Sequence, residues 1–489
     1  MSVPASIGIG AVFGLAASLC GCMVGPEPVR PPNVAAETQR FTHSLDPSES
    51  EDADFGQWWL CFGDDVTNQL VREVLKENTQ LQVAAARILE AQADLKIARG
   101  AILPQLSGSP RAIWARISPE DRQNWNVHLY QFVVNIGWQV DLWGKLRRQA
   151  HAAESGLSAT QAEAEAIMHS VVAQTISGRI LIADFQRRIE IARANVANRK
   201  HTLEAVERRY LEGLGSAVDL YLARQNFATA RAQIPELQQN LAQAHHALDV
   251  LRGQAPGTSA ALRDTLPPVP ELPPPPAGLP AHLLDRRPDL RASEMRSMAA
   301  THQIGMRVAD LLPSLTLTST LGYSSLELGQ LIDTQGSIYT LILDTAQPLF
   351  QGGMLLGRIR QAEARASQAA AEYAGSVLQS MQEVEDALVA ENRLREQLDD
   401  VIVAYEQVAA AEELARSLYI EGIGDILRVF EAERGLYESQ ARMSQLQAAL
   451  WLARVDLHLA IGGDWGVDLP TARPPATRCR ADAMTVSEQ

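Results

Sequence analysis

Two hydrophobic periodicities alternate along the chain, and they predict long helices that run directly into strands. A helical pattern covers Val66–Leu103 and ends at Pro104, because a proline disfavours helical geometry at the residue before it. The same switch recurs 209 positions later, where a second helical pattern ends at Pro313 and the period-2 alternation of Leu315–Tyr323 begins. Two uses of one helix-to-strand switch predict two structurally similar halves.

The clearest strand pattern lies over Asn126–Leu142. Its odd positions include Gln131 and Asn135, whereas its even positions are mostly aromatic or aliphatic. One apolar and one polar face over such a length indicate a membrane β-barrel with a wet interior, since most strands of soluble proteins have only ~5–6 residues. A soluble sandwich strand is the alternative, because each barrel strand gives a weak signal. We expect the following even positions to face lipid: Tyr130, Phe132, Val134, Ile136 and Trp138.

Helical periodicity fills most of the remaining sequence. In the first half we expect a helix of about 100 Å from Gly144 to Leu211, followed by a shorter helix over Ala217–Leu251. The corresponding helices of the second half cover Leu355–Leu418 and a stretch that ends near Ile461. The first long helix carries a coiled-coil seam of mostly small residues, spaced alternately by four and three: Leu146, Ala150, Ala153, Leu157, Thr160, Ala164, Ile167 and Val171.

Each half also has a glycine break at the far end of its long helix. Tyr210–Gly213 and Tyr419–Gly422 form a repeated Tyr-x-x-Gly turn, and glycine there favours the end of a helix. The remaining elements are a weaker strand from Pro104 to Ile117, a helix over Leu290–Leu311 and a strand over Ile338–Phe350. In each half, two short helices match the length of one long helix. This predicts a long helical hairpin crowned by two strands.

Four strands cannot close a barrel, and open sheet edges are not tolerated in lipid. We therefore expect the chain to oligomerise; three copies would supply 12 strands and a tube walled by helices, and other multiples are also allowed by the arithmetic. The predicted fold class is an α+β membrane protein, with long α-helical hairpins and four β-strands per chain that contribute to a shared β-barrel.

The N-terminus has the features of a bacterial lipoprotein signal. The apolar run Ile7–Leu19 is too short to span a bilayer, and it ends in Leu19-Cys20-Gly21-Cys22, which resembles a lipobox. We therefore expect residues 1–21 to be a signal peptide and Cys22 to be the lipidated N-terminus. The segment before the apolar run has no Lys or Arg, which departs from the usual signal. An ordinary cleaved signal or a buried apolar terminus is the alternative.

Composition and periodicity also predict how the chain is divided. We expect an extended arm over residues 22–64, a first repeat over 65–252, a Pro-rich linker over 253–280, a second repeat over 281–462 and a tail with a disordered composition over 463–489. A net charge of −15 argues against nucleic acid as a partner. Cys61 and Cys479 are isolated and lack metal-ligand spacing.

Several short motifs occur in order between Cys22 and about Gly462. They are the lipobox with Val24-Gly25-Pro26, Trp58-Trp59 with Phe62-Gly63-Asp64, Asp141-Leu142-Trp143-Gly144, Arg286-Arg287-Pro288-Asp289, Leu349-Phe350 with Gly352-Gly353, and the two Tyr-x-x-Gly turns. Together they resemble the TolC-type outer-membrane factors, specifically their NodT-like lipoprotein branch. The resemblance implies a homotrimer with one 12-stranded β-barrel in the outer membrane of a Gram-negative bacterium and a periplasmic α-barrel formed by the long helical hairpins. It also implies docking to a periplasmic adaptor (membrane fusion) protein and an inner-membrane pump, usually of the resistance–nodulation–division type.

The resemblance further implies a periplasmic gate in which acidic rings narrow the pore. Asp219 matches a family gate aspartate, and Glu431 lies where the family often has its inner acidic ring. Arg428 replaces an expected outer-ring aspartate, which puts a double acidic ring in doubt. We expect Arg428 to pair with Asp425, Glu431 or Asp219, and Tyr419 to hydrogen-bond at the same contact. Ordinary solvated charges are the alternative, since exposed pairs often contribute less than ~1 kcal/mol.

No enzyme motif stands out: the sequence has no G-x-S-x-G, H-E-x-x-H or P-loop. We expect no cofactor and no metal, because His245-His246 lacks the ligand count of a metal site. The predicted function is conduction of drugs or other small molecules from the pump and adaptor to the outside. A duct for type I protein secretion is the alternative within this class. A periplasmic coiled-coil scaffold without a barrel and an envelope enzyme are the alternatives outside it.

Overall fold

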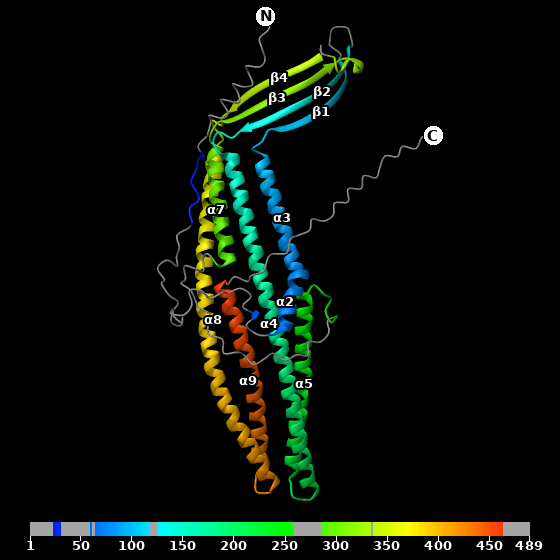
Figure 1. Cartoon of the computed structure of the whole chain (residues 1–489), viewed down its shortest axis with the longest axis vertical. Coiled ribbons are helices and arrows are strands. Elements are labelled where there is room, and N and C mark those ends of the chain that lie inside the picture. Colours follow the sequence, from blue (N-terminus) through cyan, green and yellow to red (C-terminus); the bar gives the residue numbers. More distant parts are fainter. Residues whose placement is uncertain are drawn as a thin grey trace, which may run out of the picture. The chain divides into compact units, whose positions relative to one another are not determined.

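The computed structural model describes residues 23–30, 59–60, 64–117, 125–258, 286–333 and 336–462. Long helices and one four-stranded sheet make up its structure, which confirms the predicted α+β class (Figure 1). The elements are α2 (Asp65–Glu77), α3 (Thr79–Gly100), β1 (Gln105–Ile117), β2 (Trp125–Val140), α4 (Lys145–Leu211), α5 (Ala217–Leu251), α7 (Pro288–Ala309), β3 (Ser314–Ser325), the short 3-10 helix η4 (Leu328–Gln330), β4 (Ser337–Ala346), α8 (Met354–Ile420) and α9 (Ile426–Ile461).

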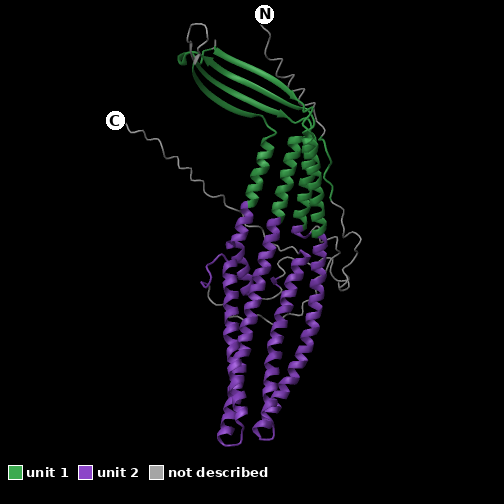
Figure 2. Cartoon of the chain, turned by 180° about the vertical axis from the view of Figure 1, so that it is seen from behind, with its two compact units in different colours: residues 1–33, 87–162, 290–376 green, residues 34–86, 163–289, 377–489 purple. Residues whose placement is uncertain are grey.

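The chain divides into two compact units (Figure 2). Unit 1 contains residues 1–33, 87–162 and 290–376, and unit 2 contains residues 34–86, 163–289 and 377–489. Each unit therefore combines segments from both predicted halves of the sequence.

The sheet of unit 1 is antiparallel, in the order β1-β2-β3-β4. Residues directly opposite one another share a face, so the register defines two faces. Val134 on β2 lies between Gly108 on β1 and Leu321 on β3, and Leu321 lies opposite Tyr339 on β4. The apolar face that contains Val134 also carries Leu106, Ala112, Trp114, Tyr130, Phe132, Ile136, Trp138, Leu315, Leu317, Tyr323, Leu341 and Leu343.

The opposite face of the sheet is mostly polar, although apolar residues also lie on it, among them Ile113, Leu129, Val133, Ile338 and Ile342. It carries Gln105, Ser107, Ser109, Gln131, Asn135, Gln139, Thr316, Thr318, Thr320, Ser324, Thr340 and Asp344. Hydrogen bonds cross the strands on this face: the Thr320 hydroxyl donates to the Asn135 side chain at 3.0 Å, and the Asn135 amide donates to Ser109 at 3.5 Å. On the apolar face, Trp114 and Tyr130 make an edge-to-face contact with ring centroids 6.1 Å apart.

The Asp-Leu-Trp-Gly motif joins β2 to α4 within unit 1. The Asp141 carboxylate accepts the backbone N–H groups of Leu146 and Arg147, both at 3.0 Å, and so satisfies donors at the start of the helix. The Trp143 indole donates to the carbonyl of Pro313 at 2.7 Å. The motif therefore links the start of α4 to the start of β3.

The segment 23–30 is fixed against the same region of unit 1. The N–H of Val24 donates to the carbonyl of Trp143 at 3.1 Å, and the Arg148 guanidinium donates to the carbonyl of Gly25 at 3.2 Å. Gly305 in α7 has no side chain where the segment passes: an added Cβ there would lie 2.8 Å from the Val24 carbonyl oxygen. The backbone of Val24 and Gly25 is thus held between the start of α4 and the last turns of α7.

Unit 2 is a helical unit with several apolar clusters. One cluster surrounds the buried Trp59 and joins α2, α4 and α9 through residues such as Val71, Ile176 and Val455. Four of the eight predicted seam positions of α4 are buried and four are half-buried, and the last three of them, Ala164, Ile167 and Val171, belong to unit 2. One 18-residue window of α4 is apolar enough to cross a bilayer, but 61% of it is buried within the protein, as in a core helix.

The two halves repeat with the predicted offset of 209 residues. α4 and α8 both have 67 residues, and each bound of α8 lies 209 positions after the matching bound of α4. The ends of α5 and α9 are held alike. The Asn78 side chain donates to the carbonyl of Leu251 at 2.8 Å, and its counterpart Arg287 donates to the carbonyl of Ala460 at 3.1 Å.

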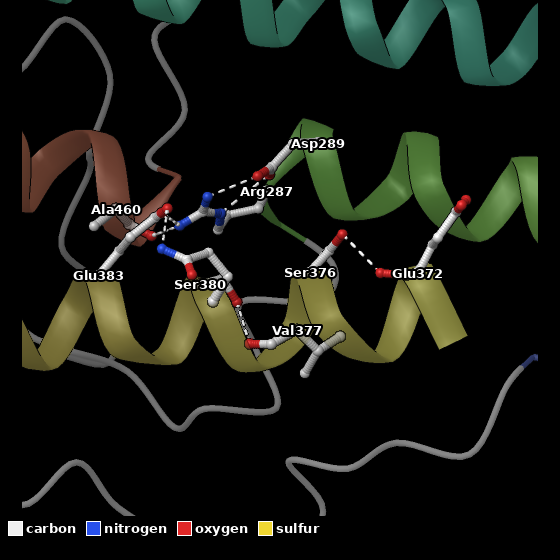
Figure 3. Close-up of polar contacts among 9 residues, drawn as sticks. Arg287, Asp289, Glu372, Ser376, Val377, Ser380, Glu383 and Ala460 are labelled. Atoms are coloured by element: carbon white, nitrogen blue, oxygen red, sulfur yellow. Dashed lines mark hydrogen bonds and ion pairs between the residues drawn. The ribbon is translucent and has the colours of Figure 1, made fainter. Parts of the chain in front are cut away.

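Arg287 also binds two carboxylates besides the Ala460 carbonyl (Figure 3). Its guanidinium binds both carboxylate oxygens of Asp289 at 3.0 and 2.6 Å, and it reaches Glu383 on α8 at 2.7 Å. Gly462, which ends α9 with φ +68°, leaves the space that Arg287 occupies, since an added Cβ would lie 2.6 Å from the arginine Cγ. The Arg-Arg-Pro-Asp motif is thus the joint between α7, α8 and α9.

Two expected elements differ in the structure. The single helix expected over Val66–Leu103 is broken at Asn78, because the Asn78 side chain caps a new helix by accepting the N–H of Gln80 at 2.8 Å. The strand expected over Ile338–Phe350 ends at Ala346, ahead of Pro348, which has no N–H for the ladder.

Candidate functional site

The two Tyr-x-x-Gly turns end α4 and α8 with the same backbone geometry. Gly213 has φ +76° and Gly422 has φ +86°, a region that favours glycine. In the first turn the N–H of Gly213 donates to the carbonyl of Tyr210 at 3.0 Å, and the next N–H donates to the carbonyl of Arg209 at 2.8 Å. The second turn repeats both bonds at 3.1 and 3.0 Å. This pair of bonds is a Schellman motif, and it fixes where each long helix ends.

Two of the predicted gate carboxylates cap the helices that follow these turns. Asp219 and Ser216 form a capping box at the start of α5, in which Ser216 accepts the N–H of Asp219 at 3.2 Å. Asp425 is the N-cap of α9 and accepts the N–H of Leu427 at 3.0 Å. Both side chains are therefore committed to their own helix ends within one chain.

Tyr419 is buried and forms the main contact between the two turns. Arg209, in the last turn of α4, donates to the carbonyl of Tyr419 at 2.7 Å, and its guanidinium carbon lies 4.8 Å from the tyrosine ring centroid. Burial raises the pKa of the Tyr419 hydroxyl, so it stays protonated. Tyr419 also belongs to an apolar cluster that includes Leu220, Ile426 and Phe430. This cluster joins the ends of α4, α5, α8 and α9.

Arg428 does not make the expected pairs within one chain. It is exposed, and among the described residues its side chain has no carboxylate partner. Glu431 instead binds Arg434, three residues further along α9, with a shortest contact of 2.5 Å. Hydrogen bonding to Arg434 lowers the pKa of Glu431, so this carboxylate is ionised.

Arg209 was not anticipated from the sequence, although one signal for it exists. A cation in the last turn of a helix is favourable because it faces the negative end of the helix dipole. Arg209 directly precedes the first Tyr-x-x-Gly turn, whereas Leu418 holds the matching place before the second turn. The difference between the two halves marks Arg209 as specific to the first.

Cys22 lies outside the described residues, as do Trp58, Cys61 and Phe62. Met23, the next residue, is described. Gly144, with φ +75°, leaves room for Met23, since an added Cβ would lie 2.6 Å from the methionine Cγ. Met23 therefore lies beside the junction of β2 and α4.

Comparisons with known proteins agree with these features. The model of the outer membrane efflux protein family matches residues 70–254 and 279–463. The chain is 27% identical over 461 residues to the cation efflux system protein CusC of Escherichia coli O6:H1, covering 93% of this chain and 98% of CusC. It is 28% identical over 468 residues to the toluene efflux pump outer membrane protein TtgF of Pseudomonas putida, covering 93% of this chain and 96% of TtgF. The solved structure of the outer-membrane channel OprN matches with a TM-score of 0.85 at 28% identity, over 91% of this chain and 100% of OprN.

Proposed function

The chain belongs to the outer membrane efflux protein family, and on that premise we propose that three copies form one outer-membrane channel for small molecules. As a member of this family, it is the outer-membrane channel component of a tripartite efflux system. The proposal of a trimer rests on the sheet of unit 1, which has one apolar and one polar face. Its order leaves β1 and β4 at the edges, and a bilayer does not tolerate unpaired edges. Three sheets joined edge to edge would give 12 strands, with the polar faces around the lumen.

Two partners follow from the same function. A periplasmic adaptor and an inner-membrane pump of the resistance–nodulation–division type would deliver the exported compound to the channel. The similar proteins are named for export of cations and toluene, which supports small-molecule efflux over a duct for protein secretion. In this proposal the pump sets which compound is exported, and the channel conducts it to the outside.

Cys22 is proposed to be acylated and to anchor the chain in the inner leaflet of the outer membrane. The support is the lipobox in the sequence together with the segment Val24–Gly25, which is hydrogen-bonded to Trp143 and Arg148 of unit 1. Two or three acyl chains give stable anchoring where one chain is marginal. Mass spectrometry of the mature protein should show a modified Cys22 at the N-terminus, and an unmodified N-terminus elsewhere would refute this assignment.

The two Tyr-x-x-Gly turns are proposed to form the periplasmic gate. Within each chain Arg209 ties the second turn to the end of α4 through Tyr419. Asp219 lies in the first turn of α5, Asp425 caps α9, and Arg428 and Glu431 lie in the first two turns of α9. Among the described residues Arg428 has no carboxylate partner, and in this proposal a neighbouring subunit supplies one. Six turns, two from each chain, would then surround the pore of the trimer.

Planar-bilayer recording tests the channel and the gate together. The purified protein should run as a heat-modifiable trimer and conduct ions with rare openings. Arg209→Ala should raise the frequency of openings because it removes the contact to Tyr419. Asp219→Ala combined with Arg428→Ala should do the same if these residues meet between subunits. Conductance unchanged in all variants would mean that apolar packing alone closes the pore, and a monomer without conductance would refute the channel.

A further inference from the structure

A second polar cluster lies in unit 2, away from the turns, and joins α4 to α8 and α9. Glu433 on α9 is buried, with 3% of its side chain exposed, and it accepts a hydrogen bond from the hydroxyl of Thr202 on α4. Arg416 on α8 lies 3.6 Å from the same carboxylate. Glu433 is the eighth residue of α9, so it lies about 10 Å along the helix from its start.

The charge of Glu433 is only weakly compensated. Arg416 makes a shorter contact with Glu412 than with Glu433. Arg199 on α4 is the second cation whose charge acts on Glu433. Among the described residues, the second carboxylate oxygen of Glu433 is buried without a hydrogen-bond partner. A buried, under-compensated carboxylate disfavours its own ionised form.

The repeat supplies a direct comparison. The positions that match Glu433 and Arg416 in the first half are Arg224 and Glu207, 209 residues earlier, so the pair recurs with its charges reversed. Arg224 and Glu207 are 2.9 Å apart, but their side chains are 55% and 38% exposed. The member of the pair on the second helix of each hairpin therefore differs in burial: Arg224 is 55% exposed and Glu433 only 3%, whereas Glu207 and Arg416 are similarly exposed at 38% and 33%. Burial against α4, and not helix pairing as such, distinguishes Glu433.

We propose that Glu433 is a proton-linked positioning residue that holds α8 and α9 against α4 in the closed gate. Movement of α8 and α9 away from α4 breaks the Thr202 bond and admits water to Glu433. The closed arrangement then binds the Glu433 proton more tightly than the open one, and opening releases it. This inference rests on the proposed channel, and it adds control of the gate by pH to the contacts proposed at the two Tyr-x-x-Gly turns.

The direction of the pH effect follows from the environment of Glu433. Burial raises its pKa, while the hydrogen bond from Thr202 and the charges of Arg199 and Arg416 act in the opposite sense, and Glu412 adds to the increase. In water the pKa returns toward its ordinary value of about 4.3. Acidification from neutral pH therefore favours the closed gate, and increasing pH above about 4.3 favours opening. Each unit by which opening lowers the pKa changes the open-to-closed ratio up to tenfold per subunit.

The test is the frequency of openings of the purified trimer in planar bilayers between about pH 4.5 and 8, a window that begins near the ordinary pKa of a glutamate. Wild type should open more often as the pH rises. Glu433→Gln keeps the shape and the acceptor for Thr202 but cannot ionise, so openings should stay rare at every pH. Glu207→Gln, the matched exposed control, should keep the wild-type profile. Thr202→Val removes a donor that stabilises the ionised form, so its profile should shift to higher pH.

The outcomes separate this inference from the channel on which it rests. A wild-type pH profile in both Glu433→Gln and Thr202→Val overturns the role of Glu433, even when Arg209→Ala still opens the gate. If Glu207→Gln also loses the pH dependence, the role of Glu433 is overturned as well, because an exposed carboxylate would then have the same effect as the buried one. Absence of conductance in every variant refutes the channel itself. Heat-modifiability of each trimer checks assembly, and Thr202→Val carries the test if Glu433→Gln does not assemble.

Discussion

Arginine at Val134 should prevent assembly of the channel, whereas arginine at the next residue should be tolerated. Val134 lies four residues from Tyr130 and four from Trp138 on the same face of β2. With a rise of ~3.3 Å per residue and a tilt of ~40°, each step of four residues covers about 10 Å of membrane depth. The aromatic residues then bound a layer of about 20 Å, close to the ~25 Å apolar band of such barrels, and Val134 lies near its midplane.

The cost at Val134 follows from this depth. Arginine at the midplane costs about 2–4 kcal/mol per subunit, or about 6–12 kcal/mol in a trimer. That range is comparable to the whole stability of a typical folded protein, about 5–15 kcal/mol. Asn135 lies on the polar face opposite Ser107 and Thr320, where arginine would meet water. Its replacement loses the 3.0 Å bond from Thr320, at a cost of about 1 kcal/mol.

The assay is the yield of heat-modifiable trimer in outer-membrane fractions, followed by planar-bilayer recording. Val134→Arg should give little or no trimer, and Asn135→Arg a near-normal yield. Because Asn135→Arg adds a positive charge to the lumen of each subunit, the surviving channel should shift toward anion selectivity. Val134→Leu is the control for the site itself. Equal yields from the two arginine variants, or a selectivity change from Val134→Arg alone, would show that the assignment of the two faces is wrong.

Three further predictions concern stability. Arg287→Ala should lower the free energy of unfolding by about 3 kcal/mol, since it leaves the ends of α7 and α9 without their shared anchor, and Arg287→Lys should restore only part of the loss in denaturant titration. Gly305→Ala should expose the segment 23–30 to protease because the added methyl overlaps Val24, whereas Gly156→Ala, a helical glycine with no atom within 4 Å of an added Cβ, should not. Burial lowers the pKa of His458 to about 3, so the folded protein should lose stability as the pH falls below ~6.5, the pKa of histidine in the unfolded chain. The loss should be about 2 kcal/mol at pH 5. His458→Gln should reduce it, as thermal melts at about pH 5 and 7.5 would show.

Most of the fold was predictable because its signals are local. Pro104 and Pro313 end helices by sterics alone, and the alternation over β2 defines two faces without knowledge of the neighbouring strands. The break at Asn78 was missed because asparagine is compatible with a helix interior, and only the contact to the end of α5 shows why the chain bends there. Such a contact joins residues far apart in sequence, and no periodicity reports it.

The gate was less predictable for a different reason. Asp219 and Asp425 are short polar residues at helix starts, so a capping role explains their presence as well as a pore does. Glu433 looked like one of many charges on a helix, because exposure of a charge depends on what packs over it. Only the packing of α9 against Thr202 shows that this carboxylate is buried.

The two halves nevertheless carry information that a single helix does not. Positions 209 apart agree where the backbone itself is constrained: the tip glycines Gly213 and Gly422 both need positive φ. They differ at positions where only the neighbouring elements constrain the side chain: Asp219 in the first half matches Arg428 in the second, and Arg224 matches Glu433. Since a duplicated hairpin needs no such exchange to fold, the reversed charges mark the places where the two hairpins meet different neighbours. Reversal of charge between the halves is thus the sequence signal that points to the proposed gate residues, which composition and motifs leave among the ordinary surface charges.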